Sequence, residues 1–203
     1  VRGIVEDAPR DRLGDMLHGW FAVWFGMSGE RRSEERACGR MQKRLERFCA
    51  LWNEPEPLWP EAALYLEELS EHLGTALQRW FERRTDKRPG DALVIRTEWP
   101  VEHLPDGEAS FRTDAMRLDL LAEVRRADGT CGPCLMVDHK CGRYEAFAEK
   151  EALAEHLKEA YGARQRDYML ALRAMGRECR CLLHLPLEGR FLELRLTEQG
   201  RES

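Results

Sequence analysis

Two aspartates and one lysine lie where two neighbouring strands could bring them together. Asp119 lies inside the apolar segment Met116–Leu121, and Asp138 ends the apolar segment Leu135–Asp138. Lys140 follows two residues later, so in an extended chain it points to the same side as Asp138. A carboxylate on a buried strand is costly unless it is paired or binds a metal. If a hairpin joins the two strands, the three side chains can converge on one point.

This set of groups suits hydrolysis of a phosphate ester. Carboxylate oxygens bind hard cations such as Mg²⁺, which keeps several waters and accepts phosphate oxygens of a substrate as further ligands. A neighbouring lysine can orient the attacking water, help to deprotonate it, and offset charge at the scissile phosphate. A salt bridge at the end of a strand among Asp119, Asp138 and Lys140 explains the three residues equally well. Motifs elsewhere in the chain are needed to decide between a catalytic metal site and a structural salt bridge.

Four segments of the chain match one family's motifs in the same order. Their sequences are RLGDMLH (12–18), MRLD (116–119), VDHKCG (137–142) and YGARQRDY (161–168). Together they resemble the RecB-type nucleases of the PD-(D/E)xK superfamily, found at the C-terminal end of helicase–nucleases such as RecB and AddA. That family has a G-x-x-x-H helix, a G-R-I-D-like strand, a D-Y-K-T-G-like strand end, and Q-x-x-x-Y or Q-x-x-Y on a helix. The resemblance spans nearly the whole chain.

The resemblance implies an α/β fold and a role for each matching residue. The fold would be a restriction-endonuclease-like PD-(D/E)xK core, with a mixed central sheet flanked by helices and an N-terminal helical subdomain. His18, Asp119 and Asp138 would bind Mg²⁺ or Mn²⁺, with the backbone carbonyl of His139 completing the protein ligands. Lys140 would be the catalytic lysine, acting together with Asp119 and Asp138.

Further residues would lie beside the active site. Tyr161, Gln165 and Tyr168 fall at positions i, i+4 and i+7, so they share one face of a helix. The resemblance implies that they contact the substrate strand or brace the lysine. Glu98 matches a family glutamate on the strand before the first aspartate, with a less defined role.

The chain departs from the family pattern at two positions. Met116 replaces the usual glycine before R-I-D, and Cys141 replaces the threonine after the lysine. The interval between Asp119 and Asp138 is also longer than usual, and we expect a turn at 128–129 and the segment 131–134 to fill a loop there. None of these departures removes a metal ligand.

The cysteines offer an alternative chemistry. The chain has seven cysteines, an odd number, and no segment resembling a signal peptide, which predicts reduced thiols rather than a disulfide framework. Cys131 and Cys134 have the C-x-x-C spacing of a zinc knuckle or a redox pair, but no second pair with zinc-site spacing follows. Cys179 and Cys181 alternate with apolar residues, which predicts a buried strand. A Cys-based zinc-binding α/β module therefore remains an alternative to the nuclease.

Composition limits the function classes. The net charge of −5 argues against a protein that coats DNA by charge alone but allows a local basic groove. Residues 30–51 hold more basic than acidic side chains. We interpret this charged segment as a solvent-exposed helix; a surface that binds the phosphates of a nucleic acid is the alternative. The mean hydropathy of −0.59 and the lack of a long apolar run predict no membrane span, so we expect a cytoplasmic protein. The chain does not begin with methionine, and we expect one domain of a longer polypeptide.

Hydrophobic periodicity divides the chain into a helical part and a mixed part. Residues 1–90 would form the helical part with the histidine motif, and residues 91–203 the core of one continuous nuclease domain. The elements expected are helices near residues 13–24, 30–51, 61–84 and 149–175, and strands at 92–99, 116–124, 135–140, 179–185 and 190–196.

The resemblance implies an exonuclease-type, RecB-like deoxyribonuclease that leaves a 5′-phosphate and a 3′-hydroxyl. Its substrate would be single-stranded DNA delivered by a helicase in recombination or repair. The chain has no G-x-x-x-x-G-K-[ST] phosphate-binding loop, so we expect the motor in the same polypeptide or in a partner subunit. A catalytically inactive nuclease-like module that binds or braces DNA is the first alternative.

Overall fold

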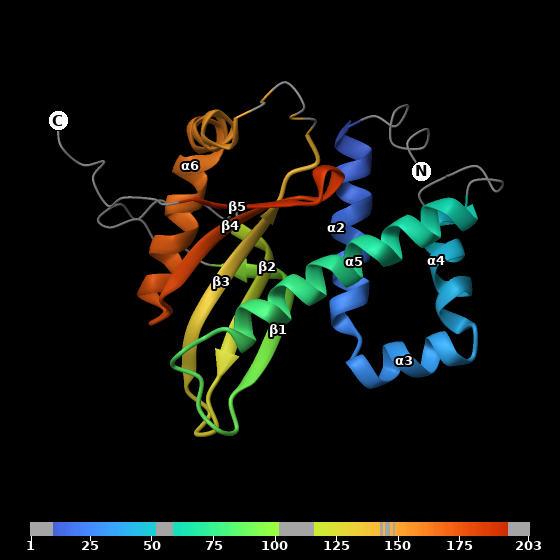
Figure 1. Ribbon diagram of the computed structural model, residues 1–203, viewed down its shortest axis with the longest axis horizontal. Coiled ribbons are helices and arrows are strands. Elements are labelled where there is room, and N and C mark those ends of the chain that lie inside the picture. Colours follow the sequence, from blue (N-terminus) through green and yellow to red (C-terminus); the bar gives the residue numbers. More distant parts are fainter. Residues whose placement is uncertain are drawn as a thin grey trace. The chain divides into compact units, whose positions relative to one another are not determined.

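The protein has an α/β fold with a five-stranded mixed sheet (Figure 1). The computed structural model describes residues 10–51, 59–101, 116–142, 144, 147 and 149–194. The chain divides into two compact units, residues 1–83 and 84–203. Among the helices that these ranges include, none is long and apolar enough to cross a membrane.

The first unit is helical. It comprises α2 (Arg10–Gly26), α3 (Gly29–Ala37), α4 (Arg40–Leu51) and α5 (Trp59–Glu82). Apolar residues spaced three and four apart form its core, as expected for amphipathic helices; fully buried members include Leu17, Trp20, Phe21, Leu45, Leu66, Leu73 and Leu77. The indole N–H of Trp20 donates to Ser70 Oγ at 2.9 Å, and that hydroxyl donates to the carbonyl of Leu66 at 2.7 Å. These bonds satisfy the polar groups inside the core and tie α2 to α5.

The helix predicted over residues 30–51 is two helices. Ser28 caps the start of α3, where its side chain accepts from the backbone N–H of Arg31 at 3.2 Å. The helix ends at Ala37 with Cys38 as its C-cap, and Gly39 follows with a φ of 70°. Glycine adopts this left-handed conformation without the steric cost that other residues meet, so the chain turns there and α4 begins. A single glycine inside a charged segment was too weak a sequence signal to show this break.

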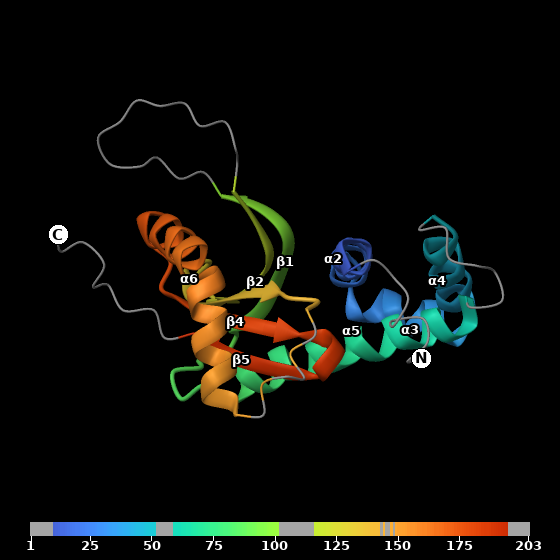
Figure 2. The same cartoon turned by 90° about the horizontal axis from the view of Figure 1, so that it is seen from above.

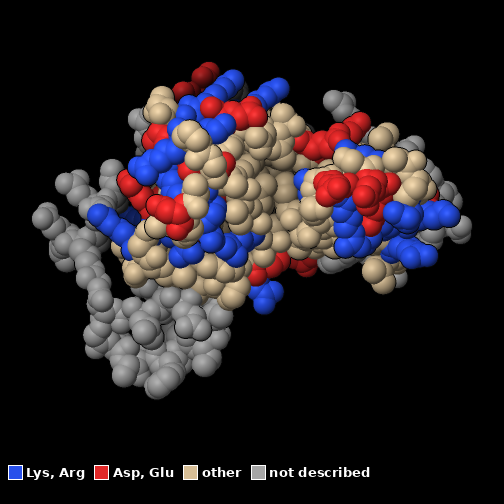
Figure 3. All heavy atoms as spheres, turned by 90° about the horizontal axis from the view of Figure 1, so that it is seen from below, with Lys and Arg blue, Asp and Glu red and all other residues tan. Residues whose placement is uncertain are grey.

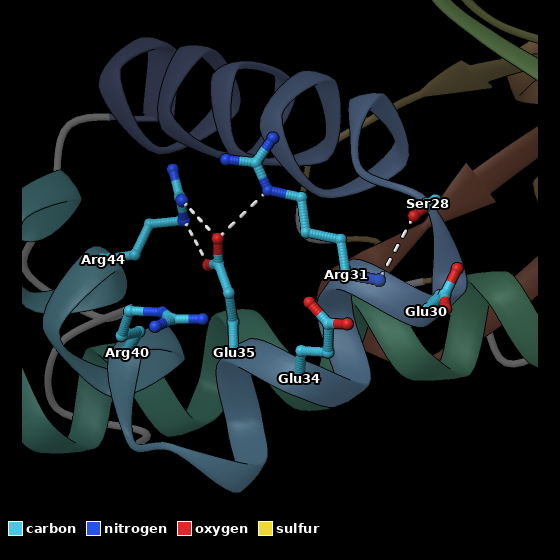
Figure 4. A pocket seen from close by; sticks show the side chains of 7 residues that line it. All are labelled: Ser28, Glu30, Arg31, Glu34, Glu35, Arg40 and Arg44. Carbon is cyan, nitrogen blue, oxygen red and sulfur yellow. Dashed lines mark hydrogen bonds and ion pairs between the residues drawn. The ribbon is translucent and has the colours of Figure 1, made fainter.

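A buried carboxylate joins α3 to α4. Glu35 is only 4% exposed and accepts from Arg31 Nε at 3.2 Å and from Arg44 Nε at 2.7 Å. Figure 4 shows it between these two guanidinium groups, in a pocket of about 470 Å³. Hydrogen bonds from Arg44, followed by those from Arg31, lower the pKa of Glu35 to about 2 although burial acts in the opposite direction.

Another arginine of the helical unit, Arg36, is also paired with carboxylates. Arg36 donates to Glu67 at 2.6 Å and to Glu71, both on α5. On the face shown in Figure 3, acidic side chains lie among the basic ones over these helices. This arrangement is that of a solvated, ion-paired surface.

Replacing Glu35 with glutamine is expected to lower the melting temperature at neutral pH. The depressed pKa means that the ionised carboxylate stabilises the fold above the unfolded-state pKa, about 4.5, and loses this effect as the pH falls towards 2. The difference between Glu35→Gln and wild type should therefore be constant above pH 5 and shrink in more acidic buffers, as followed by circular dichroism. Glu34→Gln, an exposed neighbour on the same helix, is the control. A difference that stays the same at pH 3 and pH 7 would contradict the assignment.

The second unit is built on the sheet. Its elements are β1 (Ala92–Val101), β2 (Met116–Arg125), β3 (Cys131–His139), α6 (Lys150–Ala174), β4 (Cys179–Leu185), the short 3-10 helix η2 (Pro186–Glu188) and β5 (Arg190–Leu194). The strands lie in the order β1-β2-β3-β4-β5, and all neighbours are antiparallel except β3 and β4, which are parallel. A parallel pair needs a crossover, and α6 supplies it. The last two residues of the strand predicted over 190–196 lie outside the described residues.

Helix α6 covers one face of the sheet (Figure 2). Its buried face includes Leu153, Leu157, Tyr168 and Leu172. They belong to one core cluster with side chains from β2, β3, β4 and β5: Leu118, Leu121, Met136, Cys181, Leu183, Leu185, Leu192 and Leu194. This packing fixes α6 against the strands that hold the predicted site residues.

Strand β3 begins four residues earlier than predicted. The backbone N–H of Arg126 donates to the carbonyl of Thr130 at 2.9 Å across a tight turn in which Gly129 has a φ of 84°. The turn therefore ends before Cys131, and Cys131–Cys134 belongs to the strand rather than to a loop. Residues three apart on a strand point to opposite faces, so this C-x-x-C motif cannot converge on a zinc ion.

The structure also corrects the expectation of reduced thiols. Cys134 and Cys179 are paired residues on the parallel strands β3 and β4, and a disulfide joins them with a Cα–Cα distance of 4.7 Å. Cys131 is exposed and free. The prediction that Cys179 and Cys181 lie buried in a strand is confirmed.

Reducing this disulfide is expected to lower the free energy of unfolding by about 2–4 kcal/mol, because it closes a long loop in the unfolded chain. The two cysteines are 45 residues apart in sequence. Urea unfolding with and without dithiothreitol measures the change, and Cys179→Ala should lose the dependence on reductant. Cys131→Ser, which removes an exposed thiol outside the disulfide, should keep it. Thiol titration that finds Cys134 reduced in the native protein would contradict this prediction.

Candidate active site

Adjacent strands bring Asp119 and Asp138 together. Leu120 on β2 pairs with Val137 on β3, so Asp119 and Asp138 are the next residues along the two antiparallel strands. Their carboxyl groups hydrogen-bond to each other, and the backbone N–H of His139 donates to Asp119 Oδ2 at 2.8 Å. The predicted convergence of the two acidic groups is therefore a feature of the sheet register.

Lys140 and Gln165 both contact the second aspartate. Lys140 Nζ lies 2.6 Å from Asp138 Oδ2, and the side-chain amide of Gln165 donates to the same oxygen at 2.7 Å. The lysine ammonium also lies 4.3 Å from the ring centroid of Tyr161, a cation–π contact. Lys140 is thus fixed between β3 and α6 rather than extended into solvent.

The pair of aspartates is poised to accept a cation. Burial, followed by the negative charge of Asp138 and the hydrogen bond with it, raises the pKa of Asp119 to about 8. The His139 N–H and the charge of Lys140 act in the opposite direction without cancelling these effects. Near neutral pH, Asp119 therefore holds a proton in the metal-free protein. A divalent cation would replace this proton, so the donor chemistry fits Mg²⁺ or Mn²⁺.

Glu98 adds a third carboxylate from β1. One oxygen of Glu98 and one of Asp119 lie within 4.8 Å of each other. Glu98 has a φ of 49°, which is unusual for a residue other than glycine and costs about 1 kcal/mol or more. It also lies 3.6 Å from Arg117 Nη1. Thr97 pairs with Leu120 and Trp99 with Leu118, so Glu98 lies opposite Asp119 on the neighbouring strand.

Helix α6 presents the three predicted residues on one face, but they make different contacts. Gln165 reaches Asp138 and Tyr161 reaches Lys140, as described above. Tyr168 is buried, and its hydroxyl donates to the backbone carbonyl of Arg117 on β2 at 3.0 Å. Tyr168 thus ties α6 to the strand of Asp119.

His139 has two separate roles in the local structure. Its backbone N–H binds Asp119, whereas its imidazole Nδ1 lies 2.9 Å from Nδ1 of His184 on β4. His184 stacks on Phe191, with ring centroids 4.7 Å apart. The carbonyl of His184 accepts from the backbone N–H of Lys140 at 2.9 Å, so β4 holds the end of the strand from which the lysine projects.

His18 lies on α2 of the helical unit, where it is half-buried. The sequence motif places it one residue after the fully buried Leu17. Its meeting with the acidic residues of the sheet unit stays a prediction.

Sequence reasoning missed two groups that support the site from below. The Cys181 thiol donates to Gln165 Oε1 at 3.4 Å, which leaves the amide nitrogen facing Asp138. Burial raises the pKa of Cys181 to about 12, so the group stays a protonated donor. Tyr144 hydrogen-bonds to Tyr161, and burial raises its pKa. No spacing rule predicts either contact, because both depend on how α6 crosses the sheet.

The described residues of the sheet unit thus bring together the equipment for metal-assisted hydrolysis: acidic oxygens, a fixed ammonium group and an amide that orients one carboxylate. No protein-family model matches the chain, and no curated protein matches it significantly.

Proposed function

We propose that this chain is a metal-dependent deoxyribonuclease domain with a RecB-type PD-(D/E)xK core. The observation that supports this most directly is the convergence of Asp119, Asp138 and Lys140. Lys140 Nζ lies 2.6 Å from Asp138 Oδ2, and the two aspartates hydrogen-bond to each other. A purely structural salt bridge does not require a second, half-buried carboxylate whose pKa is raised by its burial and by the first.

The proposed metal ligands are His18, Asp119, Asp138 and the carbonyl of His139, with Glu98 beside them. Mg²⁺ or Mn²⁺, when bound, supplies a Lewis acid that polarises the phosphate and lowers the pKa of the attacking water.

The remaining groups position the reactants. Lys140 places a positive charge at the reacting phosphate, which offsets the negative charge that develops during hydrolysis. Gln165 holds the Asp138 carboxylate in one orientation, and Tyr161 holds the lysine.

The proposed substrate is single-stranded DNA, supplied by a helicase motor elsewhere in the polypeptide or in a partner subunit. The site leaves a 5′-phosphate and a 3′-hydroxyl, and the protein acts in the cytoplasm during recombination or repair. An inactive DNA-binding module is the competing function. A zinc module based on Cys131 and Cys134 conflicts with their opposite orientation on β3 and with the disulfide at Cys134.

Incubation of labelled single-stranded DNA with the protein and Mn²⁺ tests the proposal. Wild type should release products that chelation of the metal abolishes, and Asp138→Asn, which preserves shape, should release none. Circular dichroism of the variant checks that it is folded. Equal amounts of product from both proteins would sink the catalytic assignment, and binding of DNA without metal-dependent cleavage would favour the inactive module.

A further inference from the structure

Arg164 is an exposed cation at the edge of the candidate site. It precedes Gln165 on α6, where its side chain is accessible to solvent while Gln165 is fully buried. Its Nε and Nη2 donate to the hydroxyl of Tyr168 at 3.0 Å and 2.8 Å. Both nitrogens bind one oxygen, so the guanidinium plane is fixed although the side chain is exposed.

Among the described residues, several other arginines are neutralised by a carboxylate, whereas Arg164 is not. Arg44, Arg126 and Arg177 each donate to a protein carboxylate. In the described part of the chain, the hydrogen-bond partner of the Arg164 guanidinium is a neutral phenol, and no carboxylate forms an ion pair with it. Its positive charge is therefore not neutralised by direct contact.

The charge of Arg164 acts on the acidic site. The hydrogen bond with Tyr168 is the main cause that raises the pKa of Arg164, and the charges of Asp138 and Asp119 contribute further. The aspartates are thus near enough to interact with the guanidinium electrostatically without binding it. A substrate strand that approaches several carboxylates needs a further compensating cation, because Lys140 is assigned to the reacting phosphate and the neighbouring phosphate is left without one.

Tyr168 links this cation to the strand of Asp119. Its hydroxyl accepts from Arg164 and donates to the carbonyl of Arg117, two residues before Asp119. The guanidinium, the helix and the acidic strand therefore form one rigid frame. A preorganised guanidinium fork binds phosphate with little further loss of conformational entropy.

We propose that Arg164 binds a backbone phosphate of the substrate strand, next to the phosphate that is cleaved, and so sets the register of the strand on the acidic site. This inference rests on the proposed function, because it takes DNA as the substrate. Its role is binding and positioning of the strand rather than activation of water.

Fluorescence anisotropy of labelled single-stranded DNA, measured without divalent metal over a series of salt concentrations, tests this role. Arg164→Gln should weaken binding and reduce the slope of log K against log salt by about 0.7, the change expected for one phosphate contact. Arg166→Gln is the matched control, since it removes an exposed arginine two residues along α6. Arg164→Lys should keep most of the slope because it retains the charge.

Tyr168→Phe separates phosphate binding from structural support. It removes the hydroxyl that holds Arg164 but leaves the charge, so its salt slope should remain that of wild type while its affinity falls. Equal slopes and affinities for Arg164→Gln and Arg166→Gln would overturn the inference, as would a wild type that binds no DNA. If either result is obtained but the wild type still cleaves DNA, only the inference about Arg164 is refuted and the proposed function is supported. If DNA binding depends on Arg164 but the protein cleaves no DNA in Mg²⁺ or Mn²⁺, the proposed nuclease activity is refuted and the phosphate-binding role of Arg164 is supported.

Discussion

Lys140→Met is expected to reduce the rate of DNA cleavage about a thousandfold, the scale of removing a preorganised charge from a reacting centre. Lys140 lies in contact with Asp138 and over the ring of Tyr161, so its ammonium group is held in one place before substrate binds. Methionine is of similar length and keeps the packing, but it has no charge to offset at the phosphate. The loss should fall on kcat, measured with saturating DNA and Mn²⁺.

Two comparisons make this expectation specific. Lys150→Met, at the exposed start of α6, removes the same charge from the same chain and should leave cleavage unchanged. Lys140→Arg should recover only part of the rate, because a planar guanidinium does not occupy the compact position of an ammonium group. A Lys140→Met protein whose kcat stays within a factor of ten of wild type would remove the lysine from the mechanism.

The alternation of side chains explains why part of the site could be predicted. Asp138 and Lys140 are two residues apart at the end of an apolar strand, so their contact needs no more than an extended backbone. Tyr161 and Gln165 are four residues apart on a helix and were expected on one face. Local periodicity determines both placements, and the structure has both on the acidic site.

Contacts between strands that are far apart in sequence could not be predicted in this way. The pairing of Cys134 with Cys179 requires that β3 and β4 be parallel and aligned at those residues. The crossover through α6 sets this alignment, and the sequence contains no local signal for it. The contact of His139 with His184 follows from the same register, so it was missed for the same reason.

Other features depend on charge pairing or on a single backbone angle. The chain has 32 lysines and arginines, and sequence alone does not separate those that bind protein carboxylates from Arg164. The positive φ of Glu98 is equally invisible, because no residue type in the surrounding strand indicates it. Tertiary structure decides which candidate side chains reach the site.

Asp119 and Asp138 repel each other when both are ionised, and this repulsion leads to a prediction that separates function from stability. Asp119→Asn should abolish cleavage and yet stabilise the metal-free protein. Asparagine has the same shape, can accept from the His139 N–H, and can donate to Asp138 without a proton to share. In the wild type, the raised pKa of Asp119 means that the folded state holds a proton that the unfolded state releases above about pH 4. Stability of the metal-free wild type therefore falls as the pH rises from about 4 to about 8, and the variant escapes this loss.

The melting temperature in EDTA should thus be higher for Asp119→Asn than for wild type, by an amount that grows between pH 5 and pH 9 and corresponds to about 1–3 kcal/mol. In Mn²⁺ the wild type should have the higher melting temperature, because the ion binds and stabilises the folded wild type, whereas the variant lacks one of the metal ligands. Asp167→Asn, an exposed position on α6, is the control and should change neither property. A variant that is less stable than wild type by the same amount at every pH would contradict this prediction. It would show that Asp119 is an ionised structural residue, and its position in the fold would not point to a metal site.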